Sequence, residues 1–295
     1  MAKIIAQGRP HDSHIWAADF VYDDSTFATG SSDGQILKWS SVDLVKHEIY
    51  IEKAHTKPIR CMKYAHGTTL LATCGCDNAT KLWDSGKQLD VLEGHSSEVK
   101  ALSWSKDNKF LATCGRDKSI FIWSADLSNN DFDINSVLQE HEGDVKRVKF
   151  IGDLLVSCSH DNTVRLWNND YDVWGKSFQT LKDHTATVWD VDAIGNSLFS
   201  CSSDGTIIKW RKSDIAYVYD SKYEHPEKMQ MHSIAHYGNM LIVIAEDGIV
   251  GVDSGTMKEQ WKIGTVEQPN YVCVSHSEKY ALICCDDGVL YSLAL

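Results

Sequence analysis

Apolar residues recur along the chain in short runs that are separated by small polar turns. The stretch LATCGRDKSIFIW (residues 111–123) shows this pattern in one place. The run Leu111–Cys114 predicts a strand, Gly115–Lys118 a tight turn and Ser119–Trp123 the returning strand, because glycine and aspartate favour turns while β-branched and aromatic residues favour strands. Apolar and polar positions alternate only weakly, which is typical of strands buried on both faces. We therefore expect antiparallel sheets that pack face to face.

An aspartate holds the same place in each of seven copies of this unit. The seven are Asp33, Asp77, Asp117, Asp161, Asp204, Asp247 and Asp287, at successive intervals of 44, 40, 44, 43, 43 and 40 residues. A tryptophan follows six residues after each of the first five, at Trp39, Trp83, Trp123, Trp167 and Trp210. A period of about 40–45 residues with a terminal tryptophan is typical of the WD-repeat propeller, in which each repeat forms one four-stranded blade. We expect an all-β fold, a single seven-bladed propeller over residues 1–295.

Five of the blades also share a histidine and a hydroxyl. The histidines precede the repeat aspartates by 20 or 22 residues, at His11, His55, His95, His141 and His184. The hydroxyls precede them by four residues, at Thr29, Thr73, Thr113, Ser157 and Ser200. In a WD-repeat fold these groups form one buried network that joins aspartate to histidine, histidine to hydroxyl, and hydroxyl to the indole N–H. Such a network is tolerated inside a protein only when every member is paired.

The last two units lack that network and are less regular. Val243 and Ile283 stand at the hydroxyl position, and Asp253 and Leu293 stand at the tryptophan position. We expect apolar packing through Met240–Ile244 and Tyr280–Ile283 to hold blades six and seven.

Both ends of the sequence are expected to build the last blade. Its third strand falls at Leu290–Leu295, so the outer strand is predicted to come from Lys3–Gln7. That pairing would close the ring and remove free sheet edges. Two polar insertions, Ser124–Asn135 and Asn168–Gly175, are predicted to be solvated hairpin loops at the blade edges.

Composition narrows the functional classes. The net charge of −12 disfavours non-specific nucleic-acid binding. The sequence MAKIIAQGRP has no apolar signal core, and no run of about 20 apolar residues occurs, so we expect a soluble intracellular protein without a membrane contact. Five of the nine cysteines precede a repeat aspartate by three residues, namely Cys74, Cys114, Cys158, Cys201 and Cys284. This fixed strand position favours buried, reduced thiols and a cytosolic or nuclear compartment.

Several groups of residues resemble catalytic or metal-binding sites, but each has a simpler structural explanation. Serine or threonine, histidine and aspartate together resemble a hydrolase triad, but here the set occurs five times with a tryptophan attached, whereas catalysis needs one copy. His225, His232 and His236 match no strong zinc pattern. Cys76 and Cys285 are single neighbours of strand cysteines, which disfavours a redox or cluster site. We therefore expect no catalytic residue, no metal and no cofactor.

Loop residues around one mouth of a propeller are not needed for packing. Their positions can be found by counting from the repeat aspartates and histidines. One set precedes each repeat aspartate: Ser32, Cys76, Arg116, His160, Ser203, Glu246 and Asp286. A second set flanks the first apolar residue after each histidine and includes His14 and Trp16, Pro58 and Arg60, Glu98 and Lys100, Asp144 and Lys146, and Thr187 and Trp189.

These positions predict a basic patch on an acidic protein. Its cations fall on blades two to four, with three aromatic rings nearby; the candidate partner-binding residues are Arg60, Lys100, Arg116, Lys146, Trp16, His160 and Trp189. Basic and aromatic side chains together are typical of a binding hot spot and suit an acidic peptide or a C-terminal carboxylate. The alternative is that the cations pair locally with Glu98 and Asp144.

Several segments resemble one particular family. They are LEGHSSEVKALSWS…FLATCGRDKSIFIW (Leu92–Trp123), EHEGDVKRVKF (Glu140–Phe150), SCSHDNTVRLW (Ser157–Trp167), the blade-five runs DHTATVWDV and SCSSDGTIIKW, and the acidic hairpin NNDYDVW (Asn168–Trp174). They look like the WD-repeat subunit of the cytosolic iron–sulfur cluster assembly targeting complex. The resemblance spans residues 1–210 and is strongest over 91–210, whereas blades six and seven are shorter and more diverged than those of the family.

The resemblance implies a scaffold. In this family the arginine of the GRDKS run is exposed and important for function, which points to Arg116. Members do not bind the cluster; they assemble with a small adaptor subunit and a large helical-repeat subunit, and they meet a hydrogenase-like cluster carrier and iron–sulfur client proteins in the cytoplasm and nucleus. Some clients carry a C-terminal tail with an acidic and a final aromatic residue. A Leu-Tyr-Arg motif of some members is here Leu166-Trp167-Asn168, so its co-chaperone contact is not implied.

We therefore expect a non-catalytic docking subunit for iron–sulfur protein assembly, monomeric when alone. The main alternative is a WD-repeat adaptor that binds peptides in a ubiquitin ligase or chromatin complex, and the absence of a flanking F-box-like segment weakly disfavours it. A propeller hydrolase would need an unrepeated acid–base pair in the channel, and the sequence offers none.

Overall fold

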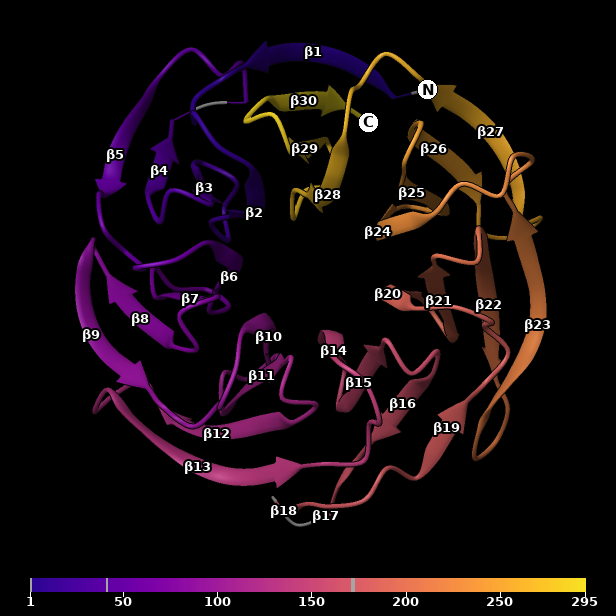
Figure 1. Cartoon of the computed structure of the whole chain (residues 1–295), viewed down its shortest axis with the longest axis horizontal. Helices are drawn as coiled ribbons and strands as arrows, with labels where there is room; N and C mark the ends of the chain where they lie inside the picture. The colour runs from indigo at the N-terminus through magenta and orange to yellow at the C-terminus, as the bar shows by residue number, and fades with distance from the viewer. Residues whose placement is uncertain (1, 41, 171–172) are drawn as a thin grey trace.

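Strands arranged in a ring make up the structure. A computed structural model describes residues 2–40, 42–170 and 173–295, and these contain strands and turns but no helix. Seven four-stranded antiparallel sheets follow one another around a central channel in chain order. The innermost strands are β2, β6, β10, β14, β20, β24 and β28 (Figure 1). The predicted seven-bladed β-propeller is confirmed. Among the described residues no helix is long and apolar enough to cross a membrane.

The strands of the first four blades follow the predicted repeat. Blade one contains β2 (Ile15–Phe20), β3 (Phe27–Ser31), β4 (Ile36–Trp39) and β5 (His47–Ile51). Blade two contains β6 (Ile59–Tyr64), β7 (Leu71–Gly75), β8 (Thr80–Asp84) and β9 (Lys87–Leu92). Blade three contains β10 (Val99–Trp104), β11 (Phe110–Gly115), β12 (Ile120–Asp126) and β13 (Asp131–Leu138). Blade four contains β14 (Val145–Ile151), β15 (Leu154–Ser159), β16 (Val164–Trp167) and β19 (Gln179–Leu181), and the short β17 (Asn169–Asp170) and β18 (Val173–Trp174) pair beside it.

The remaining blades keep the same order. Blade five contains β20 (Val188–Ile194), β21 (Ser197–Ser202), β22 (Thr206–Lys212) and β23 (Tyr217–Glu224). Blade six contains β24 (Met231–Tyr237), β25 (Met240–Ala245), β26 (Gly248–Asp253) and β27 (Lys258–Ile263). Blade seven contains β28 (Pro269–Val274), β29 (Tyr280–Cys285), β30 (Leu290–Ala294) and, from the other end of the chain, β1 (Lys3–Gly8).

The N-terminal strand closes the ring as predicted. β1 runs antiparallel to β30, with Lys3 opposite Ala294 and Gly8 opposite Leu290. Figure 1 shows β1 as the outermost strand beside the C-terminal β30. Ile4 packs against the apolar cluster of blades six and seven, which includes Leu293 and Trp261. Blade seven thus has its full set of four strands only because the two ends of the chain meet.

The predicted buried network is present in blades one to five. In blade three, Nδ1 of His95 lies 2.8 Å from Asp117, Nε2 of His95 lies 2.9 Å from Oγ1 of Thr113, and the indole of Trp123 donates to that oxygen at 3.0 Å. The other four blades repeat these contacts. An indole can only donate and a carboxylate can only accept, so the hydroxyl donates to Nε2 and the Nδ1 proton faces aspartate.

The network fixes the protonation of its aspartates. Burial acts to raise the pKa of Asp117, but hydrogen bonds from His95 and Ser119 outweigh it and lower that pKa to about 2. Asp77 shows the same balance through His55, and its pKa is also lowered to about 2. The carboxylates of both blades are therefore ionised at neutral pH, as the network requires.

Blades six and seven are held mainly by apolar packing, as expected. Val243 and Ile283 are buried in apolar clusters. In blade six, Trp261 of the outer strand packs so closely over Gly251 that a Cβ there would lie 2.0 Å from the ring. One part of the network nevertheless remains in blade six. The buried His225 stands 22 residues before Asp247, and its Nε2 lies 3.5 Å from that carboxylate.

The two insertions differ from the prediction of solvated hairpin loops. Residues 124–135 are mostly strand, since Asp126 pairs with Asp131 and the buried Phe132 packs near Trp104. In the insertion Asn168–Gly175, β17 and β18 form a small hairpin whose Trp174 is buried against Phe110 and Phe150; residues 171 and 172 at its tip lie outside the described residues. Aromatic anchors that fold back onto the blades explain both corrections.

Deleting residues 1–8 is expected to destabilise the protein by about 2–4 kcal/mol, because blade seven would lose its outer strand and expose the packing of Ile4. Urea unfolding measures the loss. The control is Ile5→Ala, which alters an exposed side chain of the same strand and should change the unfolding free energy little. An unchanged unfolding midpoint for the deletion would contradict closure by β1.

Replacing Thr113 by valine is expected to cost about 1–3 kcal/mol of unfolding free energy, because His95 and Trp123 would lose a buried partner without a change in side-chain shape. Thermal unfolding of the purified protein measures this. The reverse substitution, Val243→Thr in blade six, is the matched comparison, since it buries a hydroxyl where no network receives it. A neutral Thr113→Val would show that the network adds no stability.

Candidate functional site

Each inner strand carries one extra residue near its start. The register against the second strand slips between Ile15/Ala17, Ile59/Cys61, Val99/Ala101, Val145/Arg147, Val188/Asp190, Met231/Ser233 and Pro269/Tyr271. The residues inside these slips are Trp16, Arg60, Lys100, Lys146, Trp189, His232 and Asn270. A β-bulge leaves its extra residue outside the ladder and re-aims the side chain.

All seven bulge residues line one cavity of about 550 Å³, which we call the mouth cavity. The first residue of the inner strand, such as Ile59 or Val145, is fully buried between blades, so the following side chain points the other way, toward the channel. Five predicted site residues therefore meet here: Trp16, Arg60, Lys100, Lys146 and Trp189. His232 and Asn270 were missed because the spacing rule was applied only to blades with a complete network.

Two predicted site residues do not line the mouth cavity. Arg116, expected near the middle of the basic patch, has a side chain that is 59% exposed and lies 3.4 Å from Glu98. His160 is directed to the next blade, where its Nδ1 lies 2.6 Å from Oγ1 of Thr187. Both residues directly precede a repeat aspartate, and neither lines the mouth cavity, although Glu246 and Asp286 at the same position of blades six and seven do.

Arg60 is the cation with the most available hydrogen-bonding capacity. Its guanidinium stacks on Trp16 at 4.0 Å, and His14 is parallel to the same indole with ring centroids 5.5 Å apart. Among the described residues Arg60 has no hydrogen bond or carboxylate partner from its side chain. Burial lowers the pKa of Arg60, although a guanidinium stays charged at neutral pH. The mouth cavity thus holds a charged group whose donors are unused.

The two lysines share one carboxylate. Nζ of Lys100 lies 2.6 Å from Asp144, and Nζ of Lys146 lies 3.6 Å from the same oxygen. Lys146 also stands 4.8 Å from the ring centre of Trp189. Burial and the neighbouring Lys100 lower the pKa of Lys146 to about 8, against the opposite pull of Asp144. The lysines and Arg116 therefore pair locally, as the alternative interpretation predicted. The predicted patch thus has four cations but two carboxylates, Asp144 and Glu98.

The opposite wall of the mouth cavity is acidic. Glu246 and Asp286 line it from blades six and seven. Asp286 accepts a hydrogen bond from Asn270 at 2.6 Å and lies 3.4 Å from His14. The cavity is therefore polarised, with cations on blades two to four and carboxylates on the other side, and aromatic rings stand between them. Such a surface can orient a ligand as well as bind it.

The groups that suggested catalysis or metal binding are dispersed. Nδ1 and Nε2 of the network histidines are used in buried contacts, so they present no free base to solvent. Of the three candidate zinc histidines, His225 lies beside Asp247, His232 contacts Trp189, and His236 binds Asp192 at 2.8 Å. All nine cysteines are free, and Cys76 is the one among them that is not buried.

Comparison with known proteins agrees with this architecture. The family described as WD domain, G-beta repeat matches residues 3–40, 46–84, 86–124, 133–168 and 175–211, which is more than half of the chain. The chain belongs to the WD-repeat family. The matches run from β1 to β22, and no strand of blade six lies within them.

Three curated relatives of this WD-repeat chain show 30–36% identity. The protein named "Probable cytosolic iron-sulfur protein assembly protein 1" from Candida glabrata is 31% identical over 166 residues, 54% of this chain and 39% of the relative. Its namesake from Kluyveromyces lactis is 36% identical over 173 residues, 57% of this chain and 40% of the relative. "Mitochondrial division protein 1" of Kluyveromyces lactis is 30% identical over 188 residues, 61% of this chain and 20% of the relative. The chain thus aligns with two fifths or less of each relative's length.

Lys146 is expected to titrate near pH 8, and Asp144→Asn is expected to lower its pKa further, because the carboxylate favours the charged amine. Reductive methylation with labelled formaldehyde, followed by carbon NMR across pH 6–11, measures the titration. Glu98→Gln is the control, since Glu98 pairs with Arg116 and should leave the Lys146 titration unchanged. A pKa that rises in Asp144→Asn would contradict the assigned pairing.

Proposed function

We propose that this WD-repeat protein is a non-catalytic docking subunit of cytosolic iron–sulfur protein assembly. The mouth cavity is the observation that carries the docking role, because it presents at the channel entrance a guanidinium that stacks on Trp16 and has no carboxylate partner among the described residues. The printed names of two relatives support the assignment to iron–sulfur assembly. The rigid ring positions its partners and leaves the chemistry to them.

The cavity suits an acidic segment with an aromatic side chain. A carboxylate can pair with Arg60 through two parallel N–H donors, and Lys100 and Lys146 add positive charge on the same wall. The rings of Trp16 and Trp189 provide flat surfaces for an aromatic residue. Arg116, on the exposed rim, would then steer the approach of the ligand instead of anchoring it.

The proposed assembly has several partners. The resemblance suggests a small adaptor subunit, a helical-repeat subunit, a hydrogenase-like cluster carrier and iron–sulfur client proteins. One mouth would bind a client or the carrier, while blade edges hold the other subunits. We place this assembly in the cytoplasm, with a nuclear pool where clients act on chromosomes, and we propose that the chain is monomeric without them.

A second candidate is a docking propeller in another process. The relative named Mitochondrial division protein 1 matches a similar length of this chain, so the repeats alone do not select between processes. A peptide-binding adaptor of a ubiquitin ligase or chromatin complex would use the same mouth. The identity of captured partners separates these candidates.

Affinity capture tests the proposal with wild type, Arg60→Glu and Arg116→Glu, analysed by mass spectrometry. We expect wild type to recover iron–sulfur assembly subunits and apo-client enzymes, and we expect Arg60→Glu to reduce client recovery at least about tenfold by reversing the anchoring charge. Arg116→Glu should weaken capture less, because its side chain is exposed and already paired.

The control variant is Arg211→Glu, which reverses an exposed charge on the edge of blade five, away from the mouth cavity. Each variant should unfold within a few degrees of wild type. Recovery of ligase, histone or mitochondrial-division partners alone would contradict the proposal, and so would equal client recovery by Arg60→Glu and wild type.

A further inference from the structure

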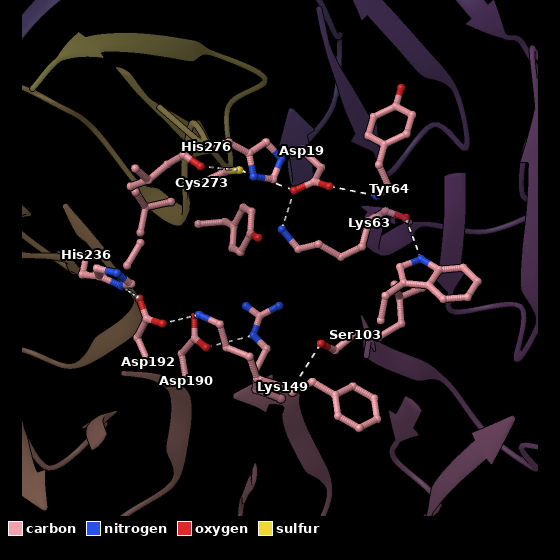
Figure 2. A pocket seen from close by; sticks show the side chains of 18 of the residues that line it. Asp19, Lys63, Tyr64, Ser103, Lys149, Asp190, Asp192, His236, Cys273 and His276 are labelled. Atoms are coloured by element: carbon pink, nitrogen blue, oxygen red, sulfur yellow. Dashed lines mark hydrogen bonds and ion pairs between the residues drawn. The ribbon is translucent and has the colours of Figure 1, made fainter. Parts of the chain in front are cut away.

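A second chamber occupies the other end of the channel. It has a volume of about 460 Å³ and lies at the far ends of the inner strands, where Asp19, Lys63, Lys149 and Asp192 line it. Arg147 and Tyr271 line both this space and the mouth cavity, so together they form the partition between the two. We call this space the opposite chamber (Figure 2).

Acids and cations occupy different depths in its wall. In each of three ion pairs the cation is the more exposed member: Lys63 at 31% against Asp19 at 11%, Arg147 at 16% against Asp190 at 5%, and Lys149 at 36% against Asp192 at 6%. The carboxylates therefore sit in the wall, and the positive groups face the space. A ligand in the chamber meets hydrogen-bond donors first.

The carboxylates of Asp19 and Asp190 in the wall already accept hydrogen bonds from other protein groups. Asp19 accepts from the backbone N–H of Tyr64 at 2.9 Å, and Asp190 accepts from Val191 at 2.8 Å and from the Ser233 hydroxyl at 3.0 Å. These contacts use part of the hydrogen-bonding capacity of the carboxylate oxygens. They also offset part of the negative charge that would repel an anion.

Lys63 and Arg147 both lie against the ring of Tyr271. The Tyr271 ring stands 6.0 Å from Nζ of Lys63 and 5.1 Å from the guanidinium carbon of Arg147. Nε of Arg147 binds Asp190 at 3.1 Å, and one terminal nitrogen makes a 3.9 Å contact with the thiol of Cys61, so several of its N–H donors remain unused. Figure 2 shows Lys63 reaching into the open space toward Asp19.

The hydroxyl of Tyr271 strengthens the case for a ligand. The residue is 8% exposed, yet its hydroxyl has no hydrogen-bond partner among the described residues. That oxygen is not one of the fully buried unpaired atoms, so it is accessible from the channel, where a ligand or solvent can meet it. The two cations that lie over the ring of Tyr271 favour a ligand that accepts several hydrogen bonds and carries negative charge.

We propose that the opposite chamber binds a small oxoanion of the phosphate class through Lys63, Arg147 and Tyr271, with Lys149 nearby. A carboxylate ligand is less suited, because several separate donors that line one space match the several acceptor oxygens of a tetrahedral anion. The aromatic side chains of Trp104 and Phe150 line the same chamber. They leave room for a small organic group on the phosphate, so the anion is either free or a phosphomonoester.

Calorimetric titration of the whole chain with inorganic phosphate, at constant ionic strength in chloride, tests the proposal. We expect saturable binding by wild type. Lys63→Gln should weaken it at least about tenfold, and Tyr271→Phe at least about threefold, because each removes a donor. Lys63→Gln leaves the buried Asp19 without its cation and so could fail to fold; Tyr271→Phe, which removes only an unpaired hydroxyl, then decides the outcome.

Tyr64→Phe is the matched control. Tyr64 is also a buried tyrosine of this chamber, but Figure 2 shows its ring pointing away from the open space, so its loss of a hydroxyl should not change binding. Arg60→Gln tests the mouth cavity separately, and it should leave phosphate binding unchanged. Its result distinguishes this site from the proposed docking role.

A parallel titration with phenyl phosphate identifies the source of the anion. Tighter binding than inorganic phosphate indicates a phosphomonoester that uses the aromatic wall, and weaker binding indicates the free ion. The proposal is overturned if wild type shows no saturable binding, if Tyr271→Phe binds as wild type does, or if Arg60→Gln abolishes binding.

Discussion

One extra residue at the start of every inner strand determines what this propeller presents. The bulge frees a single side chain per blade from the hydrogen-bonded ladder and turns it toward the channel entrance. Ring closure then brings seven such side chains together, although about 40 residues separate neighbours in the sequence. Arg60, Lys100 and Lys146 owe their proximity to this geometry, and none of them is required by the packing of the blade behind it.

The blades supply the rigidity that such a site needs. In blades one to five a chain of hydrogen bonds runs from the indole through the hydroxyl and histidine to the repeat aspartate, and every member has a partner. Blade six keeps a histidine–aspartate pair and packs Trp261 of its outer strand over Gly251. The ring therefore contains blades stabilised by the hydrogen-bonded network and blades stabilised mainly by apolar packing. The pairing of β1 with β30 closes the ring.

Much of this arrangement follows from the sequence, because a repeat states the same structural rule several times. The spacing of Asp117, His95 and Thr113 predicted the network. The residues that flank the apolar position after each histidine included five of the seven bulge residues, but the spacing did not show which flanking residue of each pair lines the mouth cavity. The rest depends on contacts between blades. The sequence around each residue does not show that Lys100 shares Asp144 with Lys146, or that Arg116 lies outside the cavity. Both depend on how neighbouring blades are placed relative to one another.

Insertions were hard to predict for a related reason. Phe132 and Trp174 lie in polar, acidic stretches that have the composition of loops, yet each ring finds an apolar surface on the blade beneath it. His225 was also misjudged, because a missing hydroxyl and tryptophan hid its position in the repeat. In both cases one buried side chain determined the local structure, although the residues around it suggested a different one.

The central claim is that the bulge side chains serve recognition and not folding. The most direct test measures the unfolding free energy and the client capture of the triple variant Arg60→Gln, Lys100→Gln, Lys146→Gln. The account predicts an unfolding free energy within about 1 kcal/mol of wild type, because the three side chains line the cavity and not the apolar core between blades, together with loss of client capture. A strongly destabilised protein, or a stable one that still captures its clients, would contradict it.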